Sequence, residues 1–285
     1  MVERIVRANG VRICLETFGR ADYPAILLIM GAAGSMDWWD DAFCARLATE
    51  SRFVIRYDNR DTGRSVAYPP GAPPYTMADL AGDAVGVLDA LGLERAHFAG
   101  ISMGAWIALI AALTRPERVA SLTVMSASPG PGDPDLPPPA PRVSALLSSD
   151  DPGPDWSDRA AVIDYYAGTQ RLFAGEPYDE ALVRRTVARA YDRSSSPASW
   201  NNHYLIAGGG AGRANLPEIK APTLVMHGTE DPLFPFAHGE AMAREIPSAE
   251  LLPLPHTGHE APPEPSWPIA IPALLRHTAP NRALS

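Results

Sequence analysis

Gly100-Ile101-Ser102-Met103-Gly104 is the stretch of sequence that decides the fold. It lies between an apolar segment at 95–99, which predicts a strand, and an apolar segment at 103–113, which predicts a helix. A serine on such a strand-to-helix turn projects its hydroxyl away from the sheet, and glycines two positions before and after it leave room for the backbone. The predicted helix also points its positive N-terminal end toward a developing oxyanion. The stretch therefore predicts a nucleophile, Ser102, with Gly100 and Gly104 as the glycines of its turn.

A nucleophilic serine needs a base, and the base needs an orienting acid. Asp231 follows a predicted buried strand at 223–227, and His259 follows the next predicted strand, at 250–254. Loops at the carboxyl ends of parallel strands converge on one edge of the sheet, so these side chains are expected to meet Ser102 there. His256 lies three residues before His259 and is an alternative base. Glu230, beside Asp231, is expected to be a solvated neighbour.

Segments of strand character and segments of helical spacing alternate on both sides of this stretch. Asn9-Gly10 predicts a hairpin turn near the start of the chain. The continuous apolar segment at 25–30 suits a strand buried on both faces, and Thr76 followed by Asp79 predicts a capped helix start. The alternation predicts an α/β fold with a mostly parallel sheet flanked by helices. The predicted strands are 4–8, 12–17, 25–30, 52–58, 95–99, 120–125, 223–227 and 250–254, and the predicted helices are 40–49, 77–91, 103–113 and about 240–245.

A segment rich in Pro and Gly, 129–141, interrupts this alternation and is expected to form neither helix nor strand. Residues 157–191 then return to helical spacing and carry several aromatic side chains. We therefore expect an inserted helical cap, or lid, at 129–215, between two core segments, 1–128 and 216–285.

The end of the chain carries five closely spaced prolines, at 262, 263, 265, 268 and 272. Proline interrupts the interior of a helix but is tolerated in its first turn. We therefore expect a short last helix that begins late, near Ile269 or Pro272, and loose residues from Ala279 onward.

Composition and charge narrow the classes of function. A net charge of −9 argues against binding to nucleic acid or to an anionic membrane. The apolar run at 25–32 is far shorter than the roughly 20 residues of a membrane helix, and no secretory leader is recognised, so a cytoplasmic protein is expected. The two cysteines, Cys14 and Cys44, are expected to be buried free thiols.

No metal and no cofactor are expected. The histidines outside the 256–259 loop show no metal-ligand spacing and are interpreted as packing or surface residues: His97, His203, His227, His238 and His277. The glycines at 208–210 lack the Gly-Lys-Ser/Thr ending of a phosphate loop. Asp58 and Asp61 are expected to brace the loop that carries Arg60 and Arg64. The sequence carries no signal for the oligomeric state.

With these residues in place, the chain resembles a serine hydrolase of the α/β-hydrolase fold nearly from end to end. Within that fold it is similar to aclacinomycin methylesterase and its relatives, which hydrolyse a methyl ester on an anthracycline. This closer resemblance is carried mainly by the N-terminal half of the chain, in Leu28-Ile29-Met30-Gly31, in the segment 56–65 (Arg-Tyr-Asp-Asn-Arg-Asp-Thr-Gly-Arg-Ser) and in Gly100-Ile101-Ser102-Met103-Gly104-Ala105.

The resemblance implies a role for each candidate residue. Ser102 matches the nucleophile and Asp231 the orienting acid. His259 matches the general base, in preference to His256, because it follows a glycine as the base of the family does. The implied cofactor requirement is none.

The resemblance also implies an oxyanion hole made of two backbone N–H groups, those of Ala32 and Met103. Many relatives carry His-Gly in the loop before the first donor, whereas this chain has Met30-Gly31. Because the donor is main chain, the hole is expected to survive this change. What is lost is a hydrogen bond that could brace the loop.

Aromatic side chains of the cap and of the loop after the oxyanion residue are candidates for a substrate pocket. They favour an apolar, ring-bearing small-molecule ester over a small charged one. The candidates are Trp38, Trp39, Tyr165, Trp200 and Tyr204.

The predicted activity is hydrolysis of a carboxylic ester, of the methylesterase type, through an acyl-enzyme. A serine at position 102 argues against the dehalogenase and epoxide hydrolase reactions that use aspartate there on this fold. Lactonase, perhydrolase or haloperoxidase, and carbon–carbon bond hydrolase activities remain open on the same residues. A cyclase or decarboxylase that uses the same pocket, and a non-catalytic ligand-binding protein on this scaffold, are the alternatives of other classes.

Overall fold

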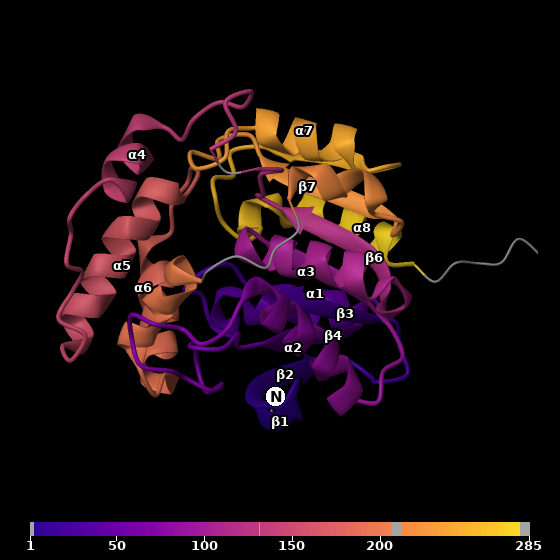
Figure 1. Cartoon of the computed structure of the whole chain (residues 1–285), viewed down its shortest axis with the longest axis horizontal. Helices are drawn as coiled ribbons and strands as arrows, with labels where there is room; N and C mark the ends of the chain where they lie inside the picture. Colours follow the sequence, from indigo (N-terminus) through magenta and orange to yellow (C-terminus); the bar gives the residue numbers. More distant parts are fainter. Residues whose placement is uncertain (1–2, 131, 207–211, 280–285) are drawn as a thin grey trace, which may run out of the picture.

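The computed structural model describes residues 3–130, 132–206 and 212–279. Within them lies an eight-stranded sheet with the order β1-β2-β4-β3-β5-β6-β7-β8 (Figure 1). The β1–β2 and β2–β4 pairs are antiparallel, and the remaining pairs are parallel. The predicted mostly parallel sheet is thus confirmed. The strands are β1 (Arg4–Ala8), β2 (Val11–Phe18), β3 (Ala25–Ile29), β4 (Phe53–Tyr57), β5 (Ala96–Ile101), β6 (Val119–Met125), β7 (Thr223–Gly228) and β8 (Glu250–Leu254).

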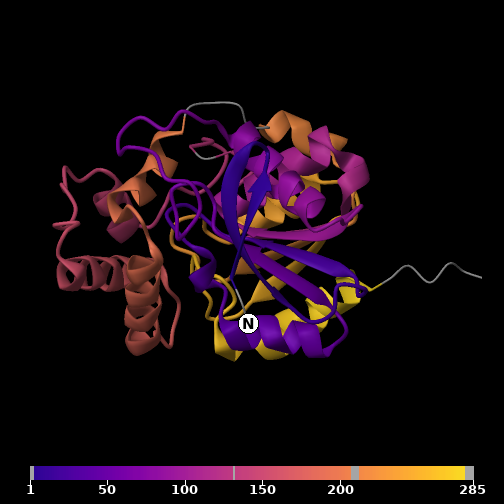
Figure 2. The ribbon, with the colours of Figure 1, turned by 90° about the horizontal axis from the view of Figure 1, so that it is seen from below.

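Helices cover both faces of this sheet (Figure 2). One face carries α1 (Asp41–Thr49) and α8 (Trp267–His277), and the other carries α2 (Met77–Ala90), α3 (Met103–Thr114) and α7 (Ala237–Glu245). Strands β3, β4 and β7 are consequently buried at every residue. This explains why their sequences are predominantly apolar and do not alternate between apolar and polar residues.

Helix α2 begins where its capping signal predicts. The Asp79 N–H donates to Thr76 Oγ1, and the Thr76 N–H donates to Asp79 Oδ2 at 2.8 Å. The two residues thereby satisfy backbone donors that the first turn of a helix leaves unpaired.

The last helix corrects the expectation of a late start. Helix α8 begins at Trp267, two residues before Ile269, with Pro268 in its first turn and Pro272 inside it. Pro268 is tolerated because a first-turn residue needs no N–H for the helix. Trp267 and Leu274 are buried against the sheet, and this packing outweighs the missing N–H of Pro272. Residues 280–285 lie outside the described part of the chain.

In the segment between β6 and β7, the described residues 126–130 and 132–140 form no helix or strand, as the Pro and Gly content predicts. The segment then forms three α-helices, which lie to one side of the sheet in Figure 1. The sequence did not indicate α4 or the 3-10 helix η3, and the glycine run 208–210 lies outside the described residues. The elements are α4 (Pro141–Leu147), α5 (Arg159–Phe173), α6 (Glu180–Arg193), η3 (Pro197–Leu205) and η4 (Arg213–Glu218); shorter 3-10 turns are η1 (Met36–Trp38), η2 (Pro116–Arg118) and η5 (Glu264–Ser266).

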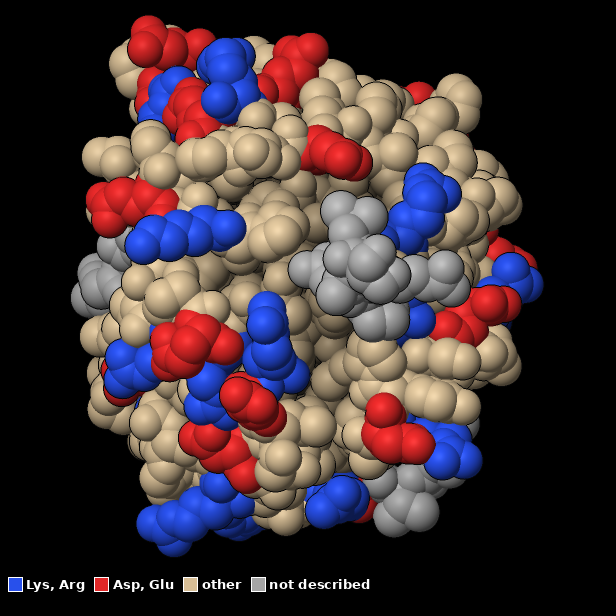
Figure 3. All heavy atoms as spheres, turned by 90° about the vertical axis from the view of Figure 1, so that its right-hand side faces the viewer, with Lys and Arg blue, Asp and Glu red and all other residues tan. Residues whose placement is uncertain are grey.

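Both cysteines are buried free thiols, and burial raises the pKa of each to about 12. On the face drawn in Figure 3, which is turned away from α4, α5 and α6, acidic and basic side chains are interspersed. No helix of the described residues combines the length and the apolar character that a membrane span requires.

Candidate active site

Ser102 lies on a strained turn between β5 and α3. With φ 54° and ψ −120°, it lies in a backbone region that non-glycine residues rarely adopt, which costs about 1–3 kcal/mol. The Ser102 N–H donates to the carbonyl oxygen of Met125 at 2.9 Å, which ties the turn to the end of β6. Such strain persists only where the surrounding structure holds it, and it is typical of functional positions.

The two glycines of this turn are required because backbone passes close to both. A Cβ on Gly100 would lie 2.1 Å from the carbonyl oxygen of Gly104. A Cβ on Gly104 would lie 2.2 Å from the carbonyl oxygen of Ile29, at the end of β3. Any side chain at either position would push the serine away from the sheet.

The loop after β3 lies beside Ser102 because β3 and β5 are neighbours in the sheet. A Cβ built on Gly31 would be 3.3 Å from Ser102 Cβ and 3.9 Å from Ser102 Oγ. The chain order reverses at this point, since β4 lies on one side of β3 and β5 on the other. Ligands of open α/β sheets bind at such a reversal, at the carboxyl ends of the strands.

The two candidate oxyanion donors begin the segments that follow these strands. Ala32 is in the loop after β3, and Met103 is the first residue of α3; both are partly exposed. Neither N–H donates a hydrogen bond to another described residue. Both are therefore free to bind a ligand oxygen.

Asp231 and His259 come together at the carboxyl ends of β7 and β8. The Nδ1 of His259 is 2.9 Å from Asp231 Oδ2. The other oxygen, Oδ1, accepts the N–H groups of Leu233 at 2.9 Å and Phe234 at 2.8 Å. The carboxylate therefore has a fixed orientation, with one oxygen directed at the imidazole.

The charged form of Asp231 is stabilised although the side chain is buried. Burial alone would raise the pKa of this carboxyl, but attraction to His259, the hydrogen bond from His259 and the Phe234 N–H together lower it below its ordinary value. Asp231 is thus an anion that accepts from Nδ1, which leaves Nε2 of His259 as the ring nitrogen available for proton transfer.

The structure separates the two candidate bases. The side chain of His256 is 76% exposed, and its Nδ1 is 2.9 Å from Glu230 Oε1, in a surface pair. The side chain of His259 is 11% exposed and contacts the buried Asp231. His256 therefore lies outside the Asp231 site, and Glu230 is its partner as well as a solvated neighbour.

The serine and the histidine are not yet hydrogen-bonded. No hydrogen bond joins Ser102 Oγ to His259, both of which are described residues. Catalytic hydrogen bonds are often long in unliganded sites and shorten when substrate binds.

Two phenylalanines that are not among the predicted pocket candidates flank the imidazole. The ring of Phe234 is 5.4 Å from the His259 ring and nearly perpendicular to it, and that of Phe173 is 6.1 Å away. Phe173 ends α5, and its carbonyl oxygen accepts the His259 N–H at 2.7 Å. The spacing of aromatic residues in 157–191 indicated a helix but not this contact.

The predicted pocket residues separate into different groups. Trp38, Tyr165 and Trp200 belong to a cluster formed by α5, α6, η3 and the loop after β3, in which Trp200 is buried. Tyr204 is 66% exposed. Trp39 packs in the core against Phe43, with ring centroids 6.1 Å apart, and is 1% exposed. The ring of Trp39 faces the α1 side of the sheet. Trp39 therefore lies apart from the cluster that contains Trp38, Tyr165 and Trp200.

Buried ion pairs connect helix α6 to the region that follows the oxyanion loop. Arg193 pairs with Asp58 at 2.6 Å and also with Asp37. Arg189 adds a second pair to Asp37, at 2.7 Å. Asp58 also accepts the N–H of Arg64, at 3.0 Å.

Asp58 and Asp61 brace the loop that carries Arg60 and Arg64, as expected. Asp61 accepts the N–H of Tyr68 and the hydroxyl of Tyr75, both at 2.6 Å. The guanidinium of Arg60 pairs with Asp83 on α2.

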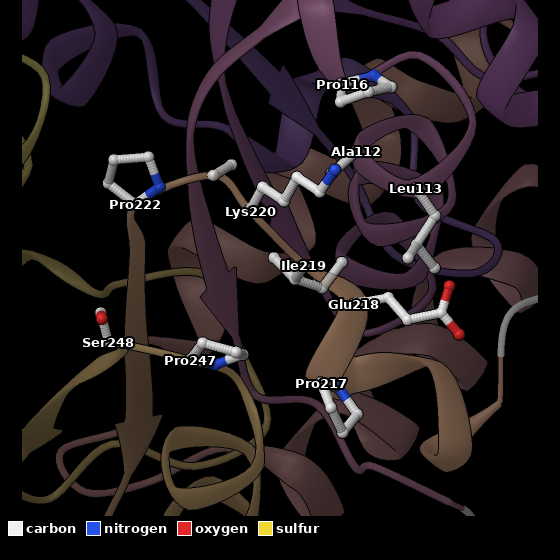
Figure 4. Close-up of a pocket in the computed structure, with 11 residues that line it drawn as sticks. Ala112, Leu113, Pro116, Pro217, Glu218, Ile219, Lys220, Pro222, Pro247 and Ser248 are labelled. Atoms are coloured by element: carbon white, nitrogen blue, oxygen red, sulfur yellow. The ribbon is translucent and has the colours of Figure 1, made fainter.

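An open hollow at the opposite edge of the sheet is separate from these residues. It is lined by the end of α3, the segment before β7 and the segment before β8, which include Leu113, Lys220 and Pro247 (Figure 4). These positions mark the amino ends of the strands, whereas Ser102, Asp231 and His259 follow their carboxyl ends. Within the described residues, no three His, Cys, Asp or Glu side chains form a group that could hold a metal ion.

Comparisons with known proteins identify the family and agree with the fold. A family model described as the alpha/beta hydrolase fold matches residues 24–265. Two rhodomycin D methylesterases are similar to this chain over 98% of its length and 98% of theirs, at 33% identity for Streptomyces sp. (strain C5) and 32% for Streptomyces peucetius. An esterase of Exiguobacterium antarcticum has the same fold, with a TM-score of 0.77 and 24% identity over 97% of this chain and 99% of its own.

Proposed function

The chain belongs to the alpha/beta hydrolase family, and from that premise we propose that it hydrolyses carboxylic esters through Ser102, Asp231 and His259. The observation that carries the proposal is the 2.9 Å contact between His259 Nδ1 and the buried Asp231, at the same sheet edge as the strained serine. A serine, a histidine and an acid in this arrangement perform acyl transfer on several unrelated folds.

In the first half of the reaction, Ser102 Oγ attacks the ester carbonyl carbon while His259 Nε2 takes its proton. Asp231 stabilises the imidazolium that forms. The N–H groups of Ala32 and Met103 hold the negatively charged oxygen of the tetrahedral intermediate. The bond to the alcohol oxygen then breaks, and the proton on His259 passes to that oxygen.

In the second half, water takes the place of the alcohol. His259 removes a proton from the water as its oxygen attacks the acyl carbon, and the same two N–H groups hold the second oxyanion. When this intermediate collapses, the proton returns from His259 to Ser102 Oγ. The acid product leaves, and no cofactor takes part.

We assign the substrate to apolar esters, of the polycyclic methyl ester class. This rests on the methylesterases to which the chain is similar along nearly its whole length. Aromatic rings at or near the site support it, namely Phe173 and Phe234 beside His259 and Trp38 with Tyr165 in the cluster above the oxyanion loop. We treat residues 129–215 as the cap that selects this substrate, inserted between the core segments 1–128 and 216–285.

The test combines active-site labelling with turnover. The purified protein is treated with a fluorophosphonate probe, the modified residue is mapped by mass spectrometry, and hydrolysis of p-nitrophenyl esters of graded chain length is measured. We expect a single label on Ser102, and we expect Ser102→Ala to lose both label and turnover while its circular dichroism is unchanged. Ser126→Ala, at a buried serine that directly follows the neighbouring strand β6, is the matched control and should keep both.

Two results would reject the proposal. Turnover that survives Ser102→Ala would assign the activity to other residues, as a cyclase or decarboxylase reading requires. A folded protein with neither label nor turnover would instead support a ligand-binding protein. If Ser102 is labelled, kcat/KM for a planar polycyclic methyl ester should exceed kcat/KM for a lactone of similar size. The reverse order would favour the lactonase alternative.

A further inference from the structure

His203 is a buried histidine of η3 that contacts the oxyanion loop. The backbone N–H of Ala33 lies 2.9 Å from His203 Nδ1, and His203 Nε2 lies 2.7 Å from the carbonyl oxygen of Arg60. A peptide N–H can only donate, so Nδ1 is the unprotonated nitrogen. Nε2 therefore carries the hydrogen and donates it to Arg60. Burial lowers the pKa of His203, which keeps the ring in this neutral form.

The loop that His203 contacts is strained. Ala33 has a φ of 59°, in the left-handed region that glycine adopts freely and alanine does not. The Gly34 N–H donates to the carbonyl oxygen of Gly31 at 3.3 Å, which closes a turn with Ala32 and Ala33 as its central residues. A positive φ at the third residue of a turn is a feature of the type II turn, where glycine or asparagine is usual.

The loop cannot hold this conformation with its own side chains. Met30, Ala32 and Ala33 offer no hydrogen-bond acceptor, and the first polar side chain, that of Ser35, donates to Asp37 at 2.7 Å. Within the described residues, the acceptor for the Ala33 N–H comes from His203, 170 positions further along the chain.

The held peptide adjoins the candidate oxyanion donor. The peptide unit between Ala32 and Ala33 begins at the Cα of Ala32. The same Cα is bonded to the nitrogen of the Ala32 N–H that would bind the oxyanion. Without His203, rotation of this peptide would return Ala33 to a negative φ and relieve its strain. Loss of this anchor would also leave the loop, and with it the Ala32 N–H, less firmly placed, and oxyanion donors act only when they are fixed within a few tenths of an ångström.

We propose that His203 is a positioning residue that holds the oxyanion loop so that the Ala32 amide faces the reacting carbonyl. The inference rests on the proposed ester hydrolysis. It gives the segment between β6 and β7 a role in the chemical step as well as in substrate selection. It also supplies the brace that Met30-Gly31 lacks.

Two substitutions separate this role from packing. His203→Asn places an amide at the level of Nδ1, where its oxygen can accept the Ala33 N–H, but it does not reach Arg60. His203→Gln reaches the level of Nε2 and can donate to Arg60, but it has no acceptor at the Nδ1 position. Both variants remain polar and similar in size, so a loss of packing would affect them alike.

The variants are compared by kcat and KM on a p-nitrophenyl ester, by the inhibition constant of a trifluoromethyl ketone, and by thermal unfolding. We expect His203→Gln to lose about 10- to 100-fold in kcat with KM within about threefold, because a misplaced donor weakens only the oxyanion state. The inhibition constant should rise with the loss of kcat, since the bound ketone carries an oxyanion. His203→Asn should keep kcat within about threefold of the unsubstituted protein.

Each outcome decides the inference. Equal kcat losses in both variants, or full activity in both, would show that His203 only packs. An unchanged inhibition constant for His203→Gln would overturn the link to the oxyanion hole. If the unsubstituted protein neither takes the fluorophosphonate label at Ser102 nor hydrolyses the ester, the proposed function fails, and the inference about His203 fails with it. If the protein is labelled and active but His203 substitutions have no effect, only the inference fails.

Discussion

Replacing Arg193 with methionine should destabilise the fold in a pH-dependent way. The Arg193 side chain is 7% exposed and contacts Asp37 and Asp58, both of which have fully buried side chains. Removing one partner of a buried ion pair costs about 3–5 kcal/mol. Arg189 still pairs with Asp37, and the N–H groups of Met36 and Arg64 still bind Asp58. We therefore expect the lower end of this range, about 3 kcal/mol at neutral pH.

The pH dependence follows from the carboxyl left behind. Burial raises the pKa of Asp58, and Arg193, together with the Arg64 and Met36 amides, opposes that rise. In Arg193→Met the positive charge beside Asp58 is gone, so the pKa of Asp58 in the folded state rises further above its value in the unfolded state. Because the folded state then binds the proton more tightly than the unfolded state, the variant is relatively more stable at low pH and loses stability as the pH rises through the folded pKa. The deficit should therefore be larger at pH 8 than at pH 5.

Urea unfolding at both pH values measures this free energy. Arg185→Met, at an exposed position of the same helix, is the matched control and should change the stability by less than about 0.5 kcal/mol. Adding Asp58→Asn to Arg193→Met should restore part of the loss and abolish its pH dependence, because the amide oxygen still accepts and carries no charge. A deficit equal to that of the control, or one that grows at low pH, would refute the reasoning.

Three further substitutions test the site. Asp231→Asn should lower kcat about 10⁴-fold with little change in stability, because the amide favours the wrong tautomer of His259. A loss of less than tenfold in steady-state assays would contradict the role of Asp231. His256→Ala should leave kcat within about twofold, because its exposed pair with Glu230 is worth at most about 1 kcal/mol; a large loss would identify it as the base after all. Gly104→Ala should lower kcat about 100-fold, because the new Cβ would collide with the Ile29 carbonyl and displace Ser102. Full activity with normal fluorophosphonate labelling would show that the turn can relax.

The sequence predicted those features that depend on neighbouring residues. The serine turn, the capped start of α2 and the order of strands and helices each follow from patterns within a few positions. The proximity of Asp231 to His259 also followed, because parallel strands bring their carboxyl ends to one edge. Here a local pattern and a rule of topology were sufficient.

The features that the sequence did not predict depend on distant residues. Trp39 follows Trp38 directly, yet their side chains go to different layers, and no local pattern decides which of the two faces the core. The start of α8 depends on the packing of Trp267, which outweighs the preference of the prolines around it. His203 and Arg193 contact residues more than 130 positions away, so nothing beside them in the chain marks their partners.

Contacts between the segment 141–205 and the loops around the candidate site limit how the enzyme can be re-engineered. The segment binds Ala33 through His203 and the 37–58 region through Arg193, and the end of α5 accepts the backbone N–H of His259. A chimera that joins a relative's helices to this core at the segment boundaries alone would lose these attachments. Transplanting the helices successfully requires exchanging the loops that they contact as well. The set of residues to exchange is therefore discontinuous in sequence although contiguous in space.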